Sequence, residues 1–370
     1  MKKTGAAPAA FRLVRLFARD FRNMAQLDFA PTPRFNVITG ENGEGKSNLL
    51  ELVDYLGDLR SFRGARGEEL IRDGREAAEI SAVVADDTGQ RYHGVSLSRK
   101  GSRRLTLNGK RPRSRYVLMK SLQTVLFHPG SLQLVSGPPS VRRDYLDRVL
   151  EKLDPTYGST FSAYQKALRS RNRLLSRPGT DRKAIAAYDE LLASAGVIIG
   201  QARAEIVRAM VPRVQEAFRD LCGGKGTLSV IYRPRVQPDI ASQRHALEQS
   251  LSRDLERGYT TEGPHADELE IGFNTSAARH HASQGQQRSI VLSLKIAELL
   301  ELEARAGRIP ILLLDDVSSE LDRNTNRRLF NYLGQIGAQV FLTTTHPEFI
   351  LLETDRRYFH VRNGCLEPVG

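Results

Sequence analysis

Residues 40–47, Gly40-Glu41-Asn42-Gly43-Glu44-Gly45-Lys46-Ser47, match the pattern G-x-x-x-x-G-K-[ST]. An apolar run, 35–39, leads into this stretch, and a helix-forming run, 46–59, follows it. Glycines let the backbone curl so that successive N–H groups point at phosphate oxygens, and the helix behind them adds the positive end of its dipole. The stretch is therefore predicted to be a nucleotide phosphate-binding loop, with Lys46 on the β- and γ-phosphates and Ser47 on Mg²⁺.

A second motif lies near the other end of the chain. The apolar run 311–314 is predicted to be a buried strand, and it ends in Asp315 and Asp316. Ligand sites of open α/β sheets lie at the carboxyl ends of the strands. Asp315 is therefore predicted to hold Mg²⁺, and Asp316 to orient or deprotonate the attacking water. The alternative is a strand that simply ends in a polar turn.

The remaining pattern predicts an α/β chain with a helical insertion. Strands are expected at 11–21, 27–29, 77–85, 91–97, 103–107, 121–127, 227–232, 269–273, 311–314 and 338–344, and helices at 46–59, 140–222, 240–255, 285–304 and 323–333. The alternation of strands and helices near the C-terminus favours a mainly parallel sheet there. A Pro-Gly pair at 178–179 predicts a helical hairpin inside 140–222.

Three short stretches around these motifs narrow the class. Residues 282–286 (Ala-Ser-Gln-Gly-Gln) open a helix, residues 319–322 (Ser-Glu-Leu-Asp) follow the two carboxylates, and His346 ends the next apolar strand. In this order they resemble the signature motif, D-loop and switch histidine of ABC-type ATPases of the SMC-like branch. The resemblance implies a composite ATP site: ATP on 40–47 of one subunit would be closed by Ser283, Gly285 and Gln286 of another, with Asp322 nearby and His346 as the switch. ATP would hold a homodimer together, and hydrolysis would release it.

Further stretches resemble the bacterial RecF family of recombination mediators. They are residues 135–147 (VSGPPSVRRDYLD), residues 262–267 (EGPHAD) and residues 60–63 (RSFR). The resemblance spans about 11–346 and implies a split ATPase head at 1–125 and 262–370, with a compact, mostly helical arm at 126–261. It also implies a role in recombinational repair and replication-fork maintenance. Such a protein would bind double-stranded, gapped or junction DNA and help load a recombinase together with other mediator proteins.

Some positions depart from the ABC pattern. Gln284 stands where transporter ATPases usually carry Gly, and Asp316 replaces their usual Glu. No clear Q-loop glutamine follows 121–127; His128 stands at about that place and Gln123 is too early. These departures predict a weak ATPase that acts as a switch, with turnover below about 10 s⁻¹, the median for enzymes.

The charge balance bears on the partner. The chain of 370 residues carries a formal net charge of +12, which favours an anionic partner such as nucleic acid. Two clusters of cations stand out, and each can be either a solvated face or a phosphate contact: Arg99, Lys100, Arg103, Arg104, Lys110, Arg111, Arg113 and Arg115 in the first, and Lys166, Arg169, Arg171 and Arg173 in the second.

Cellular location follows from what the sequence lacks. With only Cys222 and Cys365, a disulfide framework is not expected, which favours the reducing cytoplasm. Neither a secretory leader nor a membrane span of roughly 20 apolar residues is expected.

Two other functions remain open. A transporter-type nucleotide-binding subunit would share the loop, signature and histidine, although the helical insertion and the basic balance speak against it. A nuclease of the wider SMC-like group would need a further cluster of metal-binding carboxylates, which the sequence does not display.

Overall fold

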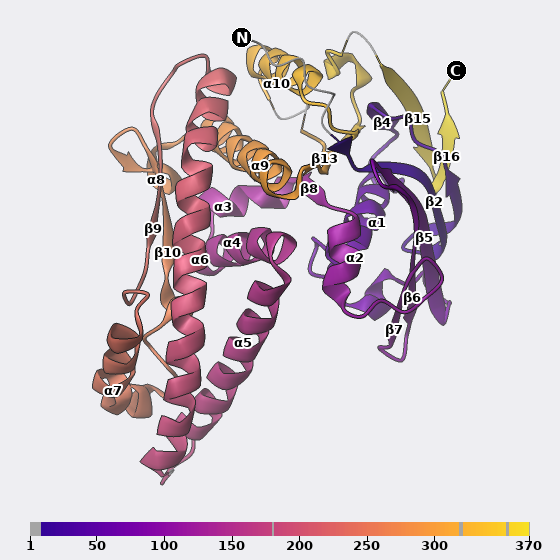
Figure 1. Cartoon of the computed structure of the whole chain (residues 1–370). Coiled ribbons are helices and arrows are strands. Elements are labelled where there is room, and N and C mark those ends of the chain that lie inside the picture. Colours follow the sequence, from indigo (N-terminus) through magenta and orange to yellow (C-terminus); the bar gives the residue numbers. More distant parts are fainter. Residues whose placement is uncertain (1–8, 180, 318–320, 353–354, 370) are drawn as a thin grey trace. The chain divides into compact units, whose positions relative to one another are not determined.

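The computed structural model describes residues 9–179, 181–317, 321–352 and 355–369. The chain divides into two compact units, both drawn in Figure 1. Unit 1 comprises residues 1–131, 220–224 and 284–370, and unit 2 comprises residues 132–219 and 225–283. Unit 2 thus begins and ends later than the predicted arm, 126–261, and residues 220–224 at the end of its longest helix belong to unit 1.

The main sheet of unit 1 has the strand order β16-β15-β4-β14-β13-β8 within the described residues. Its strands are β4 (Phe35–Thr39), β8 (Thr124–Phe127), β13 (Ile311–Asp315), β14 (Val340–Thr344), β15 (Arg356–Arg362) and β16 (Cys365–Pro368). All pairs are parallel except β15 with β16. The strands β4, β8, β13 and β14 are buried at every position, as expected for parallel strands covered on both faces. The predicted α/β class with a mainly parallel sheet is confirmed, and the antiparallel strand β16 makes this sheet mixed.

A second sheet of unit 1 is antiparallel, with the order β3-β2-β5-β6-β7. Its strands are β2 (Arg12–Phe21), β3 (Met24–Phe29), β5 (Ala77–Asp86), β6 (Gly89–Ser98) and β7 (Arg103–Leu107), and a short parallel pair is formed by β1 (Ala9–Ala10) and β12 (Arg308–Ile309). The helices of this unit are α1 (Lys46–Asp58), α2 (Arg115–Ser121), α9 (Gln284–Ala306) and α10 (Arg323–Gln335). Five apolar residues of α1 are fully buried in the core that includes side chains of both sheets, namely Leu49, Leu50, Leu52, Val53 and Leu56.

Unit 2 is mostly helical. Its elements are α3 (Gln133–Ser136), α4 (Pro139–Leu153), α5 (Pro155–Leu175), α6 (Arg182–Cys222), α7 (Ile240–Arg257) and α8 (Ala278–His281), with the strands β9 (Leu228–Arg233), β10 (Glu268–Phe273) and β11 (Ser276–Ala277). The long helices α5 and α6 form the predicted hairpin, and α6 continues through Pro212 as one helix (Figure 1). Although α6 has 41 residues, no helix in the described part of the chain is both long and apolar enough to cross a membrane.

The structure differs from the sequence-based expectation at one strand and adds strand pairings that were not predicted. The run 121–127 is a strand only from Thr124, because Leu118 and Leu122 are both fully buried at helical spacing and α2 extends to Ser121. The strands predicted at 227–232 and 269–273 pair with each other, since β9 pairs along its whole length with β10. The C-terminal hairpin β15–β16 was not predicted.

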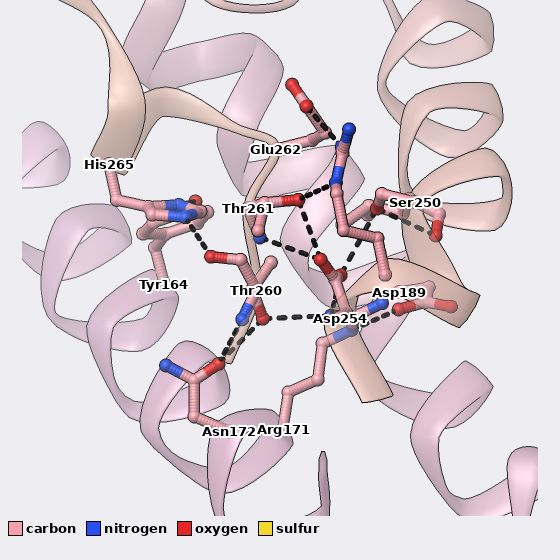
Figure 2. A network of polar contacts seen from close by, with 12 residues as sticks. Tyr164, Arg171, Asn172, Asp189, Ser250, Asp254, Thr260, Thr261, Glu262 and His265 are labelled. Atoms are coloured by element: carbon pink, nitrogen blue, oxygen red, sulfur yellow. Dashed lines mark hydrogen bonds and ion pairs between the residues drawn. The ribbon is translucent and has the colours of Figure 1, made fainter. Parts of the chain in front are cut away.

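Arg171 does not belong to the predicted basic surface. Its side chain is fully buried. Its Nε donates to Asp189 Oδ1 at 2.7 Å and its Nη1 to Asp254 Oδ2 at 2.8 Å, as Figure 2 shows. The guanidinium therefore holds α5, α6 and α7 together, while Lys166, Arg169 and Arg173 remain exposed on α5.

The buried His93 on β6 makes the stability of unit 1 sensitive to acid. Its Nε2 lies 3.2 Å from Ser121 Oγ, and the hydroxyl of Ser121 donates to the Leu118 carbonyl at 2.7 Å. Nε2–H is therefore the donor and Nδ1, which has no partner among the described residues, carries no proton. Burial, and secondarily the charge of Arg91, lowers the pKa of His93 to about 4.

We expect the parent protein to lose about 2 kcal/mol of unfolding free energy through His93 between about pH 7.5 and about pH 5. The folded pKa lies below the unfolded value, so this contribution is present above about pH 6.5 and is lost as the pH falls towards 4. The measurement is urea unfolding of the parent and of His93→Gln at both pH values. The same acid-induced loss in both proteins would contradict the assignment to His93.

Candidate nucleotide-binding site

The carboxyl ends of three neighbouring strands bring the predicted residues together in unit 1. In the register of the sheet, Thr39 of β4 pairs with Thr344 of β14, and Thr343 of β14 pairs with Asp315 of β13. The glycine-rich loop follows β4 directly, and α1 begins at Lys46. The two motifs, 268 residues apart, therefore lie at one edge of the sheet.

Lys46 is held in the loop by backbone carbonyls. Its Nζ donates to Gly40 O and Glu41 O, both at 2.8 Å, and the residue is 7% exposed. Burial lowers the pKa of Lys46, while the carboxylates of Asp316, Asp315 and Glu44 act in the opposite direction. The ammonium is thus placed beneath a loop where it can neutralise phosphate charge.

Two glycines of the loop are required by its geometry. Gly40 has φ 150° and Gly45 has φ 116°, both values that favour glycine. A Cβ on Gly40 would lie 2.5 Å from the carbonyl oxygen of Val361, and one on Gly45 would lie 2.8 Å from the Asn23 side chain. The loop therefore packs closely against its neighbours, and its curl depends on residues that lack a Cβ.

The chemistry at Ser47 and Asp315 fits Mg²⁺. The Ser47 hydroxyl donates to Asp315 Oδ1 at 2.8 Å, and the Thr343 hydroxyl donates to the same oxygen at 2.6 Å. Mg²⁺ prefers oxygen ligands and is commonly held by one or two protein groups together with phosphate and water. The described residues contain no group of three or more His, Cys, Asp or Glu side chains that could hold a metal ion. A carboxylate cluster of the kind that a nuclease would need is therefore not found among them.

Asp316 and His346, which are predicted to act in catalysis together with Lys46, differ in how firmly the structure holds them. Asp316 has φ 51°, a left-handed conformation that non-glycine residues rarely adopt, and its N–H donates to Thr343 Oγ1 at 2.9 Å. His346 is exposed; its Nδ1 lies 3.1 Å from Glu348 Oε1 and its ring 5.4 Å from that of Phe349. The backbone at Asp316 is thus fixed by β14, whereas the imidazole of His346 is open to solvent.

Residues predicted for the second half of a composite site are mostly exposed. Ser283, the last residue of unit 2, and Gly285, in the first turn of α9, are both exposed, and Gln286 is half-buried. A Cβ added to Gly285 would meet no atom within 4 Å. Neither packing nor backbone conformation of the single chain requires glycine there.

The predicted D-loop is only partly described. Residues 319 and 320 lie outside the described residues. Asp322 is the N-cap of α10: it accepts from the N–H groups of Asn324 and Thr325 at 3.0 and 3.1 Å and from the Thr325 hydroxyl at 2.6 Å. These hydrogen bonds, that of the hydroxyl first, lower the pKa of Asp322. The contacts found are structural, and its nucleotide role stays a prediction.

The residues that support the phosphate-binding loop, Asn23, Asn363 and Gly364, were not predicted from the sequence. Glu44 O accepts from Asn23 Nδ2 and from the Gly364 N–H, each at 2.9 Å, and the Glu44 carboxylate accepts from the Asn363 N–H. Asn363 and Gly364 form the turn between β15 and β16. An Asn-Gly pair is a strong hairpin signal and could have revealed this turn, although not its contact with the loop.

The stretch 60–63 contacts α1 through a buried carboxylate of that helix. Glu51 on α1 is fully buried, and its carboxylate accepts from Arg22 at 2.8 and 2.9 Å and from the Ser61 hydroxyl. The ring of Phe62 lies 4.7 Å from that of His128, which follows β8. This stretch therefore fixes α1 and also contacts the residue at the expected Q-loop position.

A hollow of about 890 Å³ adjoins the phosphate loop within unit 1. Its lining includes Gly43 and Glu44 of the loop and Asn48 of α1, together with Arg22, Asn23 and Arg63. Arg63 Nη1 donates to Asn48 Oδ1 at 2.7 Å, and Asn48 Nδ2 donates to Asn23 Oδ1 at 2.8 Å. The hollow is large enough for a small-molecule ligand and is lined by polar groups held in place by one another.

Comparison with known proteins supports the same class. The family model described as RecF/RecN/SMC N terminal domain matches residues 12–365. The DNA replication and repair protein RecF of Anaeromyxobacter sp. (strain Fw109-5) is 40% identical over 369 residues, covering 97% of this chain and 99% of the relative. The protein of the same name from Myxococcus xanthus (strain DK1622) is 39% identical over 350 residues, covering 92% of each.

Solved structures agree. The structure described as the recombination mediator protein RecF-ATPrS in the RecFOR pathway matches with a TM-score of 0.90 and 29% identity, over 99% of this chain and 100% of that one. The Smc head domain derived from Pyrococcus furiosus shares the fold, with a TM-score of 0.59 and 16% identity. These comparisons give no support to a transporter subunit. The match over nearly the whole length of its relatives shows that this chain belongs to the RecF family.

Proposed function

We propose that the protein is an ATP-dependent DNA-binding protein of recombinational repair and replication-fork maintenance that acts in the cytoplasm. The observation that carries the proposal is the joining of Lys46, Ser47 and Asp315 at one edge of the sheet in a RecF-family chain. In its ATP complex, Lys46 would neutralise the β- and γ-phosphates, and the loop N–H groups would hold their oxygens. Ser47 and Asp315 would hold Mg²⁺, which would supply charge neutralisation for the triphosphate.

ATP would also close a homodimer. Ser283, Gly285 and Gln286 of one subunit would cover the phosphates bound to the loop of the other, with Asp322 contributing from its loop. The support is that Ser283 and Gly285 are exposed and that open space surrounds the missing Cβ of Gly285. An exposed site with open space around it suits close contact with the phosphates bound to a second subunit.

Hydrolysis would reset the protein slowly. Asp316 would orient the attacking water, and His346 would contact the γ-phosphate from β14. The support is the fixed backbone of Asp316 next to Asp315 and the exposure of His346. Multiple turnover should stay below about 10 s⁻¹, as suits a switch more than a motor.

The proposed partners are duplex, gapped or junction DNA, other recombination mediator proteins and the recombinase that they load. Support comes from the net charge of +12, the names of the curated relatives and the RecFOR pathway named with the solved relatives. The experiment is to measure the mass of the protein in solution with and without ATP, each with and without duplex DNA. A dimer that needs ATP and binds DNA is expected; a monomer under all four conditions would contradict the proposal.

Ser283→Arg is expected to leave ATP binding by the monomer within about twofold and to abolish the ATP-dependent dimer. Ser283 is exposed in the single chain, so the larger side chain is accommodated there, whereas bulk and charge would block the contact with the partner's phosphates. Ser252→Arg, an equally exposed serine on α7, is the matched control and should dimerise normally. A Ser283→Arg variant that dimerises like the parent would refute the composite site.

A further inference from the structure

Five arginines of unit 1 surround one hollow of about 440 Å³, which we call the arginine groove. The residues that line it are Arg103, Arg104, Leu105, Thr106, Gly109, Arg111, Pro112, Arg113, Ser114 and Arg115. No aspartate or glutamate is among them, so the lining carries five positive charges without an internal counter-charge. The fold thus gathers most of the first cation cluster of the sequence around one concave site.

One part of the arginine groove is fixed by backbone hydrogen bonds of β7 and the turn that follows it. Arg103 and Arg104 lie on β7, which pairs with β6. Beyond β7 the chain turns at Asn108 and Gly109, with φ of 52° and 75°, and the turn is closed by two hydrogen bonds between Leu107 and Lys110. Asn108 is further held by Tyr92, whose N–H donates to its side chain at 2.9 Å and whose carbonyl accepts its N–H at 2.8 Å. Arg103 and Arg104 are therefore mounted on a paired strand, which lowers the entropic cost of binding, whereas Arg111 and Arg113 lie in the segment 111–114 between β7 and α2.

The arginines of the groove divide into two kinds. Arg103 Nη1 donates to the Leu59 carbonyl at 2.6 Å, and Arg115 Nη2 donates to the Tyr116 hydroxyl at 2.9 Å. Arg104, Arg111 and Arg113 are exposed, and their side chains make no hydrogen bond or ion pair with any described residue. Like charges mounted close together repel one another, so these three do not serve the fold and are available to an anion.

We propose that the arginine groove binds the phosphodiester backbone of DNA; this rests on the proposed DNA-binding function and locates it. Guanidinium groups match phosphate oxygens in a bidentate geometry, and the hydroxyls of Thr106 and Ser114 can donate to the same oxygens. Only Leu105 and Pro112 among the lining residues are apolar. An acidic protein would need a buried aromatic or aliphatic anchor that this lining does not offer, so DNA is the occupant that the groove fits.

Arg103 connects the arginine groove to α1, the helix that follows the phosphate-binding loop. Leu59, which accepts the hydrogen bond from Arg103, is the C-cap residue of α1, and α1 begins with Lys46. Arg103 also reaches the Tyr55 hydroxyl on the same helix at 3.4 Å. DNA in the groove and ATP at the loop would therefore act on opposite ends of one helix.

The test compares two triple variants that remove equal charge. R104Q/R111Q/R113Q neutralises the free arginines of the groove, and K166Q/R169Q/R173Q neutralises the exposed stripe on α5. Affinity for a fluorescently labelled duplex is measured with ATP over a series of salt concentrations. The groove variant is expected to bind at least about tenfold more weakly, and the slope of log K against log salt should flatten by about 0.9 for each phosphate that is no longer neutralised, and so by up to about 2.7. The stripe variant should keep the parent slope, and both should bind ATP like the parent.

The other outcomes overturn the proposal in distinguishable ways. Equal decreases in affinity for the two variants would mean that general charge, and not the groove, attracts DNA. A groove variant with parent affinity and slope would place DNA elsewhere on the molecule. If the parent binds polyglutamate and the groove variant does not, while both bind duplex DNA equally, the groove binds an acidic protein and not DNA. A parent protein that binds ATP but no DNA would overturn the proposed function itself, together with the groove.

Discussion

The Lys46→Ala variant is expected to lose ATP affinity by about 10- to 100-fold and to remain a monomer when ATP is added. Hydrogen bonds made by a charged group contribute about 1.5–3 kcal/mol, which sets this range. The ammonium is also the only side-chain cation of residues 40–47, so no neighbour in the loop can take over the phosphate charge. ATP affinity is measured by titration calorimetry, and the dimer by its mass in solution.

The reason for so large an effect is the environment of Lys46. Its Nζ donates to the carbonyls of Gly40 and Glu41, and burial lowers its pKa. Phosphate oxygens would replace or supplement these acceptors with full negative charge beside a lysine that is only 7% exposed, and such contacts are stronger at a buried group than at the surface.

Lys225→Ala is the matched control, because Lys225 is an exposed lysine of unit 2 and its substitution removes the same charge. It should bind ATP and dimerise like the parent. Unchanged unfolding of Lys46→Ala in urea would show that the effect is local. Normal ATP-driven dimerisation of Lys46→Ala would refute the role of residues 40–47.

Local pattern was enough to predict the elements that form the nucleotide site. The glycine-rich loop and the apolar strand before Asp315 are each defined by a few adjacent residues, and parallel strands align their carboxyl ends without further information. The meeting of Ser47 with Asp315 could be expected for this reason, and the structure gives it at 2.8 Å. Short apolar runs are less certain: 121–127 was predicted as strand throughout, but its first residue belongs to α2.

Contacts between remote polar residues were not predictable. The hairpin turn at Asn363 supports Glu44 from 319 residues away, and no local pattern specifies that distance. Arg171 looked like a member of a solvated stripe because arginine is usually exposed. Its burial depends on Asp189 and Asp254, which come from two other helices. Sequence spacing shows which residues share one face of a helix. It does not show which other segments of the chain pack against that face.

The same limit applies to the stretches by which the sequence resembled the RecF family. Asp147, the last residue of 135–147, and Asp267, the last residue of 262–267, both bind the buried Arg203 of α6. The resemblance identified the stretches, but only the structure shows that two of them meet on one guanidinium inside unit 2.

Arg203→Met is expected to destabilise unit 2 by about 3–5 kcal/mol. Arg203 donates to both oxygens of Asp147 at 2.8 Å, and its Nη1 donates to Asp267 Oδ2 at 3.0 Å and to the Pro264 carbonyl at 2.6 Å. Although burial lowers the pKa of Arg203, Asp147 holds it well above the ordinary value. Methionine fills a similar space but leaves two buried carboxylates without their cation. The measurement is the free energy of unfolding in urea, followed by a signal from unit 2.

Arg233→Met is the matched control. Arg233 forms an ion pair with Glu270 at 3.0 Å, but both side chains are more than half exposed, and such pairs contribute about 0–1 kcal/mol. The comparison therefore separates a buried network from a surface pair with the same substitution. A cost of Arg203→Met no greater than that of Arg233→Met would contradict the assignment.

The pH dependence of this cost identifies its cause. Burial already raises the pKa of Asp267, against hydrogen bonds from Tyr232 and Arg235 and the charge of Arg203. Without the charge of Arg203, the pKa of Asp267 should rise further above its unfolded value, so the unfavourable contribution of this buried carboxylate is full at neutral pH and is relieved as the pH falls and it is protonated. The difference between parent and Arg203→Met should therefore shrink towards about pH 5. A packing defect alone would give a difference that does not change with pH, and that result would assign Arg203 a purely steric role.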